Sequence, residues 1–181
     1  MPKTTRDEEL PRFAIFRERD ARFYSEVPVM YAEAMSPTVA ENWPKLQEAG
    51  YDGGHEVKLL FSAPGFSLTH VWFKSGFPLP RHSHNADCLY YVVAGTLRIG
   101  SEELGPGDGF FIGEDAPYTY TPGEGGVEVL EFRTSDRFNI KFLADNPAFW
   151  RTAVEQVRSR SETWASEVRP ASALRSGGTA S

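Results

Sequence analysis

Two histidines separated by one residue are the strongest chemical signal in this chain of 181 residues. His82 and His84 lie in a segment that we expect to be extended, where alternate side chains point to the same face. Two imidazoles on one face of a strand can chelate a single metal ion. Cys88 is the only cysteine of the chain and follows shortly after them, so its thiolate could join them. This spacing predicts a mononuclear metal site.

Tyrosines near this pair could act on an organic molecule. Tyr90 shares a face with Cys88 on one predicted strand, and Tyr118 and Tyr120 share a face on a later one. A tyrosine hydroxyl can act as an acid or a base beside a metal, so Tyr118, Tyr120 and Tyr90 are the catalytic candidates. The substrate-binding candidates are the other side chains expected to face the same interior, namely Trp72, Phe111, His70 and Arg133.

Short strands would have to position these residues. Residues 56–63 and 66–74 are rich in β-branched and aromatic side chains, and Pro64-Gly65 forms a turn between them. Further strand-like segments alternate with glycine and proline turns up to Arg133, with no helical period between them. Such a series predicts an antiparallel β-barrel or jelly roll, and the length of the chain suits one domain.

Residues 56–133 resemble the cupin superfamily, whose first motif is Gly, five residues, His-x-His, three or four residues, Glu, six residues, Gly. Cys88 stands at the Glu position of this motif, and the residues that match at the required spacings are Gly76, His82, His84 and Gly95. The second motif is similar to residues 106–112, with Tyr118 at the position of the ligand His. The resemblance implies an all-β fold, a single cupin barrel (double-stranded β-helix or jelly roll) with an N-terminal helical extension and a C-terminal helix.

The resemblance also implies a cofactor, one divalent transition metal held by His82, His84, Cys88 and Tyr118. Such a set is softer than the histidines and carboxylate of iron and manganese cupins, so Zn, Ni or Cu suits it as well as Fe. Thiol dioxygenases of the superfamily also have a cysteine at the motif Glu, there cross-linked to a tyrosine, but this chain lacks their third His. Cys88 therefore has three interpretations: a metal ligand, a small packed side chain or a cross-linked residue.

The expected function is that of a metal-dependent cupin enzyme with oxygenase-type chemistry, such as a mononuclear dioxygenase. Its substrate would be a small, partly aromatic or carbonyl-containing organic molecule, because no cationic cluster or glycine-rich phosphate loop is evident. A cupin isomerase or lyase is one alternative. The other is a non-catalytic small-molecule-binding or sensor cupin, in which the tyrosines only stack on the ligand and hydrogen-bond to it.

The charge balance limits the partners. A net charge of −6 and a pI near 5.3 argue against nucleic acid and against an anionic membrane. No apolar run is long enough to cross a bilayer, and the charged N-terminus lacks the apolar core of a secretory signal, so we expect a cytoplasmic location. The aromatic residues of the N-terminal segment, including Phe13 and Phe16, could cover a barrel edge in a second copy, which predicts a homodimer.

The chain divides by composition into four parts. They are an N-terminal extension with short helices (1–54), the cupin barrel (55–135), a C-terminal helical segment (136–169) and a mobile tail (170–181). In the third part, Asn146 can cap a helix that begins at Pro147 and carries one apolar stripe. His55 lies beside a predicted turn, and we expect it to be a solvated loop residue.

Overall fold

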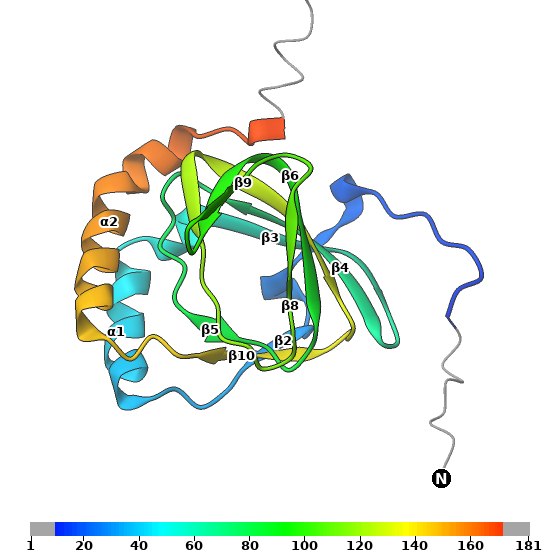
Figure 1. Cartoon of the computed structure of the whole chain (residues 1–181), viewed down its shortest axis with the longest axis horizontal. Coiled ribbons are helices and arrows are strands. Elements are labelled where there is room, and N and C mark those ends of the chain that lie inside the picture. The colour runs from blue at the N-terminus through cyan, green and yellow to red at the C-terminus, as the bar shows by residue number, and fades with distance from the viewer. Residues whose placement is uncertain (1–9, 172–181) are drawn as a thin grey trace, which may run out of the picture.

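The computed structural model describes residues 10–171, and Figure 1 shows a barrel of strands with two helices along one side. The strands are β1 (Arg22–Phe23), β2 (Met30–Ala32), β3 (His55–Ala63), β4 (Phe66–Phe73), β5 (His82–Ser83), β6 (Cys88–Ile99), β7 (Glu102–Leu104), β8 (Gly109–Ile112), β9 (Thr121–Arg133) and β10 (Phe138–Phe142). The helices are α1 (Pro37–Glu48), α2 (Pro147–Ser166) and the 3₁₀ turns η1 (Glu18–Asp20), η2 (Tyr24–Glu26) and η3 (Tyr51–Gly54). The predicted all-β class with a C-terminal helix is confirmed.

Two sheets form the barrel. The larger has the order β1-β3-β4-β9-β6-β7, with β8 also paired to β6, and the smaller has the order β2-β10-β5. An isolated bridge between His82 and Tyr118 joins β5 to the segment that precedes β9. The histidine motif and the second motif are therefore neighbouring segments in the barrel wall.

The register of β9 decides which side chains face the barrel interior. Glu131 pairs with Thr69 on β4 and with Tyr90 on β6. Because side chains alternate along a strand, Arg133 points the same way as Glu131, whereas Glu128 points outward. Strand β9 lies between β4 and β6, so a charged pair enters the interior from the middle of the larger sheet.

Gly95, the last residue of the first motif, has a backbone reason to be glycine. Its φ is 74°, and a Cβ there would lie 2.2 Å from the carbonyl oxygen of Gly126 on β9. No other residue could accept this approach without shifting the strands. The motif glycine thus allows β6 and β9 to remain paired across the irregularity beside it.

The parts flanking the barrel contain strands that the sequence did not predict. β1 pairs with β3, β2 lies parallel to β10, and β10 also pairs with β5. β1 and β2 have two and three residues, too few for a periodic signal, so only helices were expected before residue 55. Of the tail predicted to be mobile, residues 172–181 lie outside the described part of the chain.

Helix α2 begins as predicted and supports one side of the barrel. The Asn146 side chain accepts a hydrogen bond from the Ala148 N–H at 2.9 Å, and Pro147 occupies the first turn. The buried stripe ends at Trp164, whose indole N–H donates to the carbonyl oxygen of Ser75 at 3.0 Å. Within residues 10–171, neither this helix nor any other is both long and apolar enough to cross a membrane.

Candidate functional site

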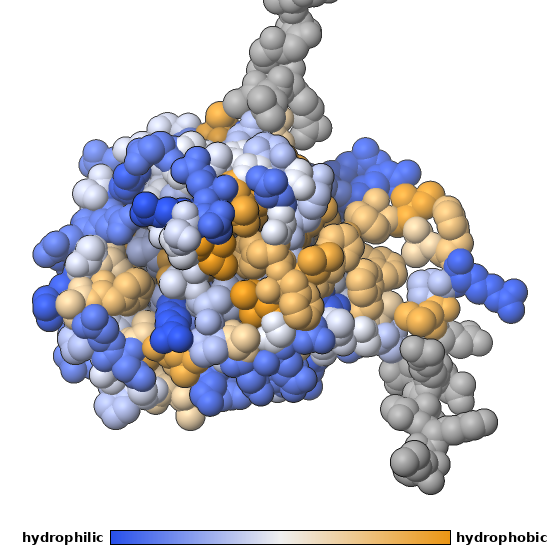
Figure 2. Space-filling model, in the orientation of Figure 1, coloured by the Kyte–Doolittle hydropathy of each residue, from blue (hydrophilic) through white to orange (hydrophobic). Residues whose placement is uncertain are grey.

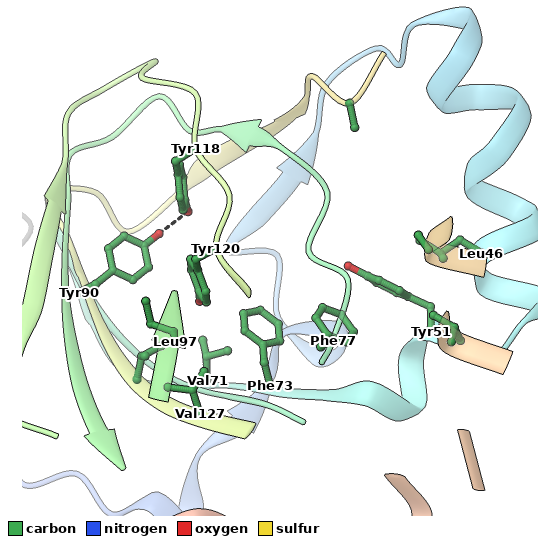
Figure 3. Close-up of a cluster of buried hydrophobic side chains, with 14 of the residues drawn as sticks. Leu46, Tyr51, Val71, Phe73, Phe77, Tyr90, Leu97, Tyr118, Tyr120 and Val127 are labelled. Atoms are coloured by element: carbon green, nitrogen blue, oxygen red, sulfur yellow. Dashed lines mark hydrogen bonds between the residues drawn. The ribbon is translucent and has the colours of Figure 1, made fainter. Parts of the chain in front are cut away.

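A cavity of about 420 Å³ lies inside the barrel. Much of its wall is apolar or aromatic, and Figure 3 shows Tyr120, Phe73, Phe77 and Tyr51 in a row from the barrel interior towards α1. A smaller group of polar side chains also lines it: His55, His82, His84, Tyr118, Glu131 and Arg133. An apolar wall with a few convergent polar groups is the usual form of a small-molecule site.

The two motif histidines present the same nitrogen to the cavity. His82 Nδ1 lies 2.7 Å from the Pro80 carbonyl oxygen, and His84 Nδ1 lies beside that of Asn139. A carbonyl can only accept, so both Nδ1 atoms carry the hydrogen and both Nε2 atoms are acceptors. Burial, aided by the charge of Arg133, lowers the pKa of His82 to about 4 and that of His84 to about 2. Both imidazoles are therefore neutral near pH 7.

These fixed tautomers give direction to a chain of hydrogen bonds. His82 Nε2 must accept from the Tyr118 hydroxyl, 2.9 Å away, so Tyr118 in turn accepts from Tyr90, whose hydroxyl lies in close contact (Figure 3). Arg133 Nη2 donates to the Tyr90 oxygen at 3.4 Å. The donors run from Arg133 through Tyr90 and Tyr118 to His82, and each hydroxyl uses its only proton in this direction.

Glu131 and Arg133 form a buried ion pair in the cavity wall. Arg133 Nη1 donates to Glu131 Oε2 at 2.6 Å, and the two residues are only 3% and 6% exposed. The guanidinium also lies 4.4 Å from the centre of the Phe138 ring. The sequence predicted Arg133 as a site residue but missed Glu131. Strand alternation could have identified it, because Glu131 lies two residues before Arg133 on the same face.

The residues at the motif positions do not complete a metal site. His82 and His84 are suitable anchors, with ring centres 5.0 Å apart and fixed tautomers. Cys88 is buried but does not line the cavity, and burial raises the pKa of its thiol to about 12. Within residues 10–171, no group of three His, Cys, Asp or Glu side chains could hold an ion. Of the predicted ligands other than the histidines, only Tyr118 lines the cavity, so the full ligand set stays a prediction.

The predicted roles of His70 and Trp72 need correction, because both lie on the outer face of β4. His70 Nε2 lies 2.9 Å from Glu128 of β9, and the Trp72 ring lies under Lys74 and Arg169. The alternate residues of β4, such as Val71 and Phe73, line the cavity instead. Both faces of this strand are buried, so burial alone could not show which one faces the interior.

Two further expectations are also corrected. Phe111 lies opposite Leu89 on the outer face of β8 and is 62% exposed, so it does not reach the cavity. His55, expected in solvent, begins β3 and lines the cavity, where burial lowers its pKa. Tyr90 does not line the cavity and reaches it only through its hydrogen bond to Tyr118. Tyr120 lines the wall, and its buried hydroxyl has no partner among the described residues.

Part of the wall comes from the N-terminal extension, whose aromatic residues we expected to cover an edge of the barrel. Met30 and Met35 lie on or after β2, and Trp43 projects from α1 with its ring centre 4.7 Å from that of Phe142. Residues that precede the barrel in sequence therefore complete its cavity. No sequence signal links them to the motifs, since the contact depends on how the extension folds back.

Comparison with known proteins assigns the chain neither a family nor an activity. No protein-family model matches the sequence, and no curated protein sequence matches it either. Solved structures similar to the chain include KdgF from Halomonas sp. (22% identity, TM-score 0.42, covering 45% of this chain and 80% of that one). An RmlC-like cupin from Shewanella frigidimarina is also similar, with 23% identity and a TM-score of 0.41, covering 46% of this chain and 78% of that one. A third is the polyketide cyclase RemF from Streptomyces resistomycificus, with 22% identity and a TM-score of 0.46, covering 59% of this chain and 82% of that one.

Proposed function

We propose that this chain is a cupin-type enzyme that binds a small organic molecule with a carbonyl group or an aromatic ring and moves a proton on it. The reaction would be of the isomerase or lyase type. One observation carries the proposal: the Tyr118 hydroxyl lies in the cavity wall and donates to His82 Nε2 at 2.9 Å. A hydroxyl held on a neutral imidazole is an arrangement suited to general acid–base catalysis.

The transfer uses atoms that already face one another. In one concerted step the Tyr118 oxygen takes a proton from the carbon next to the ligand carbonyl while the Tyr118 proton moves to His82 Nε2, so that the ligand becomes an enolate and no free phenolate forms. Tyr90 donates to the Tyr118 oxygen from the other side and stabilises the charge that forms there. Return of the proton to another carbon gives an isomer, whereas departure of a leaving group from the enolate gives an elimination.

Metal-dependent chemistry of the oxygenase type is the second candidate. The specific observation in its favour is the anchoring of both motif histidines through Nδ1, which leaves Nε2 of His84 free and that of His82 in contact only with the Tyr118 hydroxyl. Such outer hydrogen bonds are typical of metal-binding histidines. A bound metal would supply Lewis-acid or oxygen chemistry, with His82 and His84 holding it.

Proton exchange from a simple ketone tests the first candidate. We expect the protein to speed the exchange of the α-protons of 2-tetralone in D₂O, followed by NMR in the presence of a chelator. Tyr118→Phe removes the hydroxyl and should slow this exchange by about 100-fold or more. Tyr91→Phe is the matched control, since Tyr91 lies on the outer face of β6 and should leave the rate unchanged.

The outcome separates the functional classes. An exchange rate no faster than in buffer, both with the chelator and with a divalent metal in its place, would contradict the enzyme proposal and leave a non-catalytic binding protein. A rate that appears only when a divalent metal replaces the chelator would favour the second candidate. Equal rates for the parent protein and Tyr118→Phe would remove this tyrosine from the mechanism.

A further inference from the structure

The charged groups of the cavity wall balance one another. The wall contains three such side chains, Glu131, Arg133 and Asp52, and Asp52 is exposed. The Arg133 guanidinium is occupied by Glu131 at one Nη, by Tyr90 at the other and by Phe138 on its face. The charge of Arg133 is therefore already balanced by Glu131 when an anion enters, although the Arg133 Nε has no partner among the described residues.

Besides the Arg133 Nε–H donor, the polar atoms that remain free in the wall include acceptors. Among the described residues, His84 Nε2 has no hydrogen-bond partner, and only one of the two carboxylate oxygens of Glu131 accepts from Arg133. Tyr120 adds a hydroxyl without a partner. A ligand hydroxyl can donate to these acceptors and can also accept, whereas a carboxylate can only accept and leaves His84 Nε2 and the free Glu131 oxygen unpaired.

We infer that the cavity takes uncharged ring compounds that carry a hydroxyl group and rejects carboxylates of the same size. Glu131 sets this choice, because it neutralises Arg133. The inference names the ligand class for the proposed function and rests on it only in placing the ligand in this cavity.

Desolvation explains the preference. A carboxylate loses its water on entering and comes to lie near the Glu131 carboxylate, with the Arg133 charge already paired. A neutral hydroxyl loses less on leaving water and regains a hydrogen bond at His84 Nε2 or at Glu131. Its ring then packs against the aromatic side of the wall, which includes Phe73 and Phe77.

Binding of two matched probes tests the inference. The neutral probe is 4-hydroxyacetophenone, and the anionic one is 4-hydroxybenzoate, which has nearly the same size. By titration calorimetry at neutral pH with a chelator present, we expect the neutral probe to bind at least about tenfold more tightly. Equal or tighter binding of 4-hydroxybenzoate would overturn the inference, and so would no binding of the neutral probe at millimolar concentration.

A charge variant tests the role assigned to Glu131. Glu131→Gln frees the Arg133 charge, so the affinity for 4-hydroxybenzoate should rise by about tenfold or more while that for the neutral probe changes little. Glu128→Gln is the matched control, because Glu128 is a buried glutamate of the same strand that pairs with His70 on the outer face. An unchanged preference in a folded Glu131→Gln protein would overturn the role of this residue.

Two more variants keep the test decisive. If Glu131→Gln does not fold, the double variant Glu131→Gln/Arg133→Met removes both charges and should keep the preference for the neutral probe. A preference for the anionic probe there would contradict the inference.

The variant Tyr118→Phe separates the inference about the ligand class from the proposed function. Loss of proton exchange with retained selectivity in this variant supports both. A parent protein that exchanges protons but shows no selectivity would overturn only the ligand class, and normal exchange by Tyr118→Phe would contradict only the proposed mechanism.

Discussion

Cys88 is the residue at which the chain departs most from the cupin motif. Its side chain is buried at the start of β6, directly opposite Arg133 of β9. It lies outside the cavity wall, and burial raises the pKa of the thiol, so its placement favours the packed interpretation over a metal ligand. We therefore propose that any metal would be held through the imidazoles of His82 and His84.

Cobalt binding checks this placement of the ligands. We expect Co²⁺ added to the purified protein to produce no thiolate charge-transfer band, and Cys88→Ser to bind it as the parent does. The double variant His82→Ala/His84→Ala should lose all binding at this site, since it removes both anchors. His55→Ala should retain it. A thiolate band that disappears in Cys88→Ser would restore the predicted ligand set.

Local spacing predicted those site residues that belong to the motifs, and it failed where the face of a strand mattered. His82, His84 and Tyr118 follow from the spacing, and all three line the cavity. His70 and Trp72 were assigned to the wrong side, because alternation separates two faces without saying which is inside. That assignment depends on what covers the outer face, and here the cover includes Arg169, far away in the sequence.

At the scale of elements, α2 holds the apolar end of the cavity in place. Trp164 is fully buried, with its ring centre 6.0 Å from that of Phe77, which lines the cavity. Both rings press on Gly54, where a Cβ would lie 2.6 Å from each of them. The helix, the η3 turn and the cavity wall therefore share one packed contact.

Shortening Trp164 should loosen this contact. Trp164→Ala removes a buried indole and its hydrogen bond to Ser75, so we expect the free energy of unfolding to fall by about 3–5 kcal/mol in urea titrations. Val168→Ala, an exposed position close to the same helix, is the control and should change it by less than about 0.5 kcal/mol. A loss below about 1 kcal/mol for Trp164→Ala would mean that the helix does not brace the barrel.

Sequence patterns predicted elements with strong local signals and missed those made by distant pairing. Asn146 and Pro147 correctly predicted where α2 begins, and the segments rich in β-branched residues correctly predicted the strands of the barrel. α1, which begins at Pro37 and is capped by Ser36, lies in the N-terminal part where short helices were expected. β10 was missed because its strand character comes from pairing with β2 and β5.

At the scale of the whole molecule, one side exposes much apolar surface. Leu89 and Phe111 face each other across β6 and β8 and are 51% and 62% exposed, and Phe13 of the N-terminal segment is 81% exposed. Figure 2 shows apolar side chains gathered from the barrel strands to the N-terminal segment. Large exposed apolar patches commonly mark protein interfaces. We propose that a second copy of the chain covers this side.

Light scattering tests the homodimer. At micromolar concentration the expected mass is twice the 20.2 kDa of one chain. The double variant Leu89→Asp/Phe111→Asp places charges in the proposed interface and should give the monomer mass, while its circular dichroism stays unchanged because both positions are exposed. Arg98→Glu, an exposed change further along β6, should remain dimeric. A monomer mass for the parent protein would end this proposal.

The hydrogen-bonded chain from Arg133 to His82 also bears on how the protein folds. Its members come from β9, β6, the segment before β9 and β5, so every link joins residues distant in sequence. Such contacts form only after long loops have closed, which places them late in folding. A partly folded chain would then have no polar wall to offer a ligand. Ligand binding and barrel closure are thus thermodynamically linked, and an occupied cavity draws the population towards the native state by mass action.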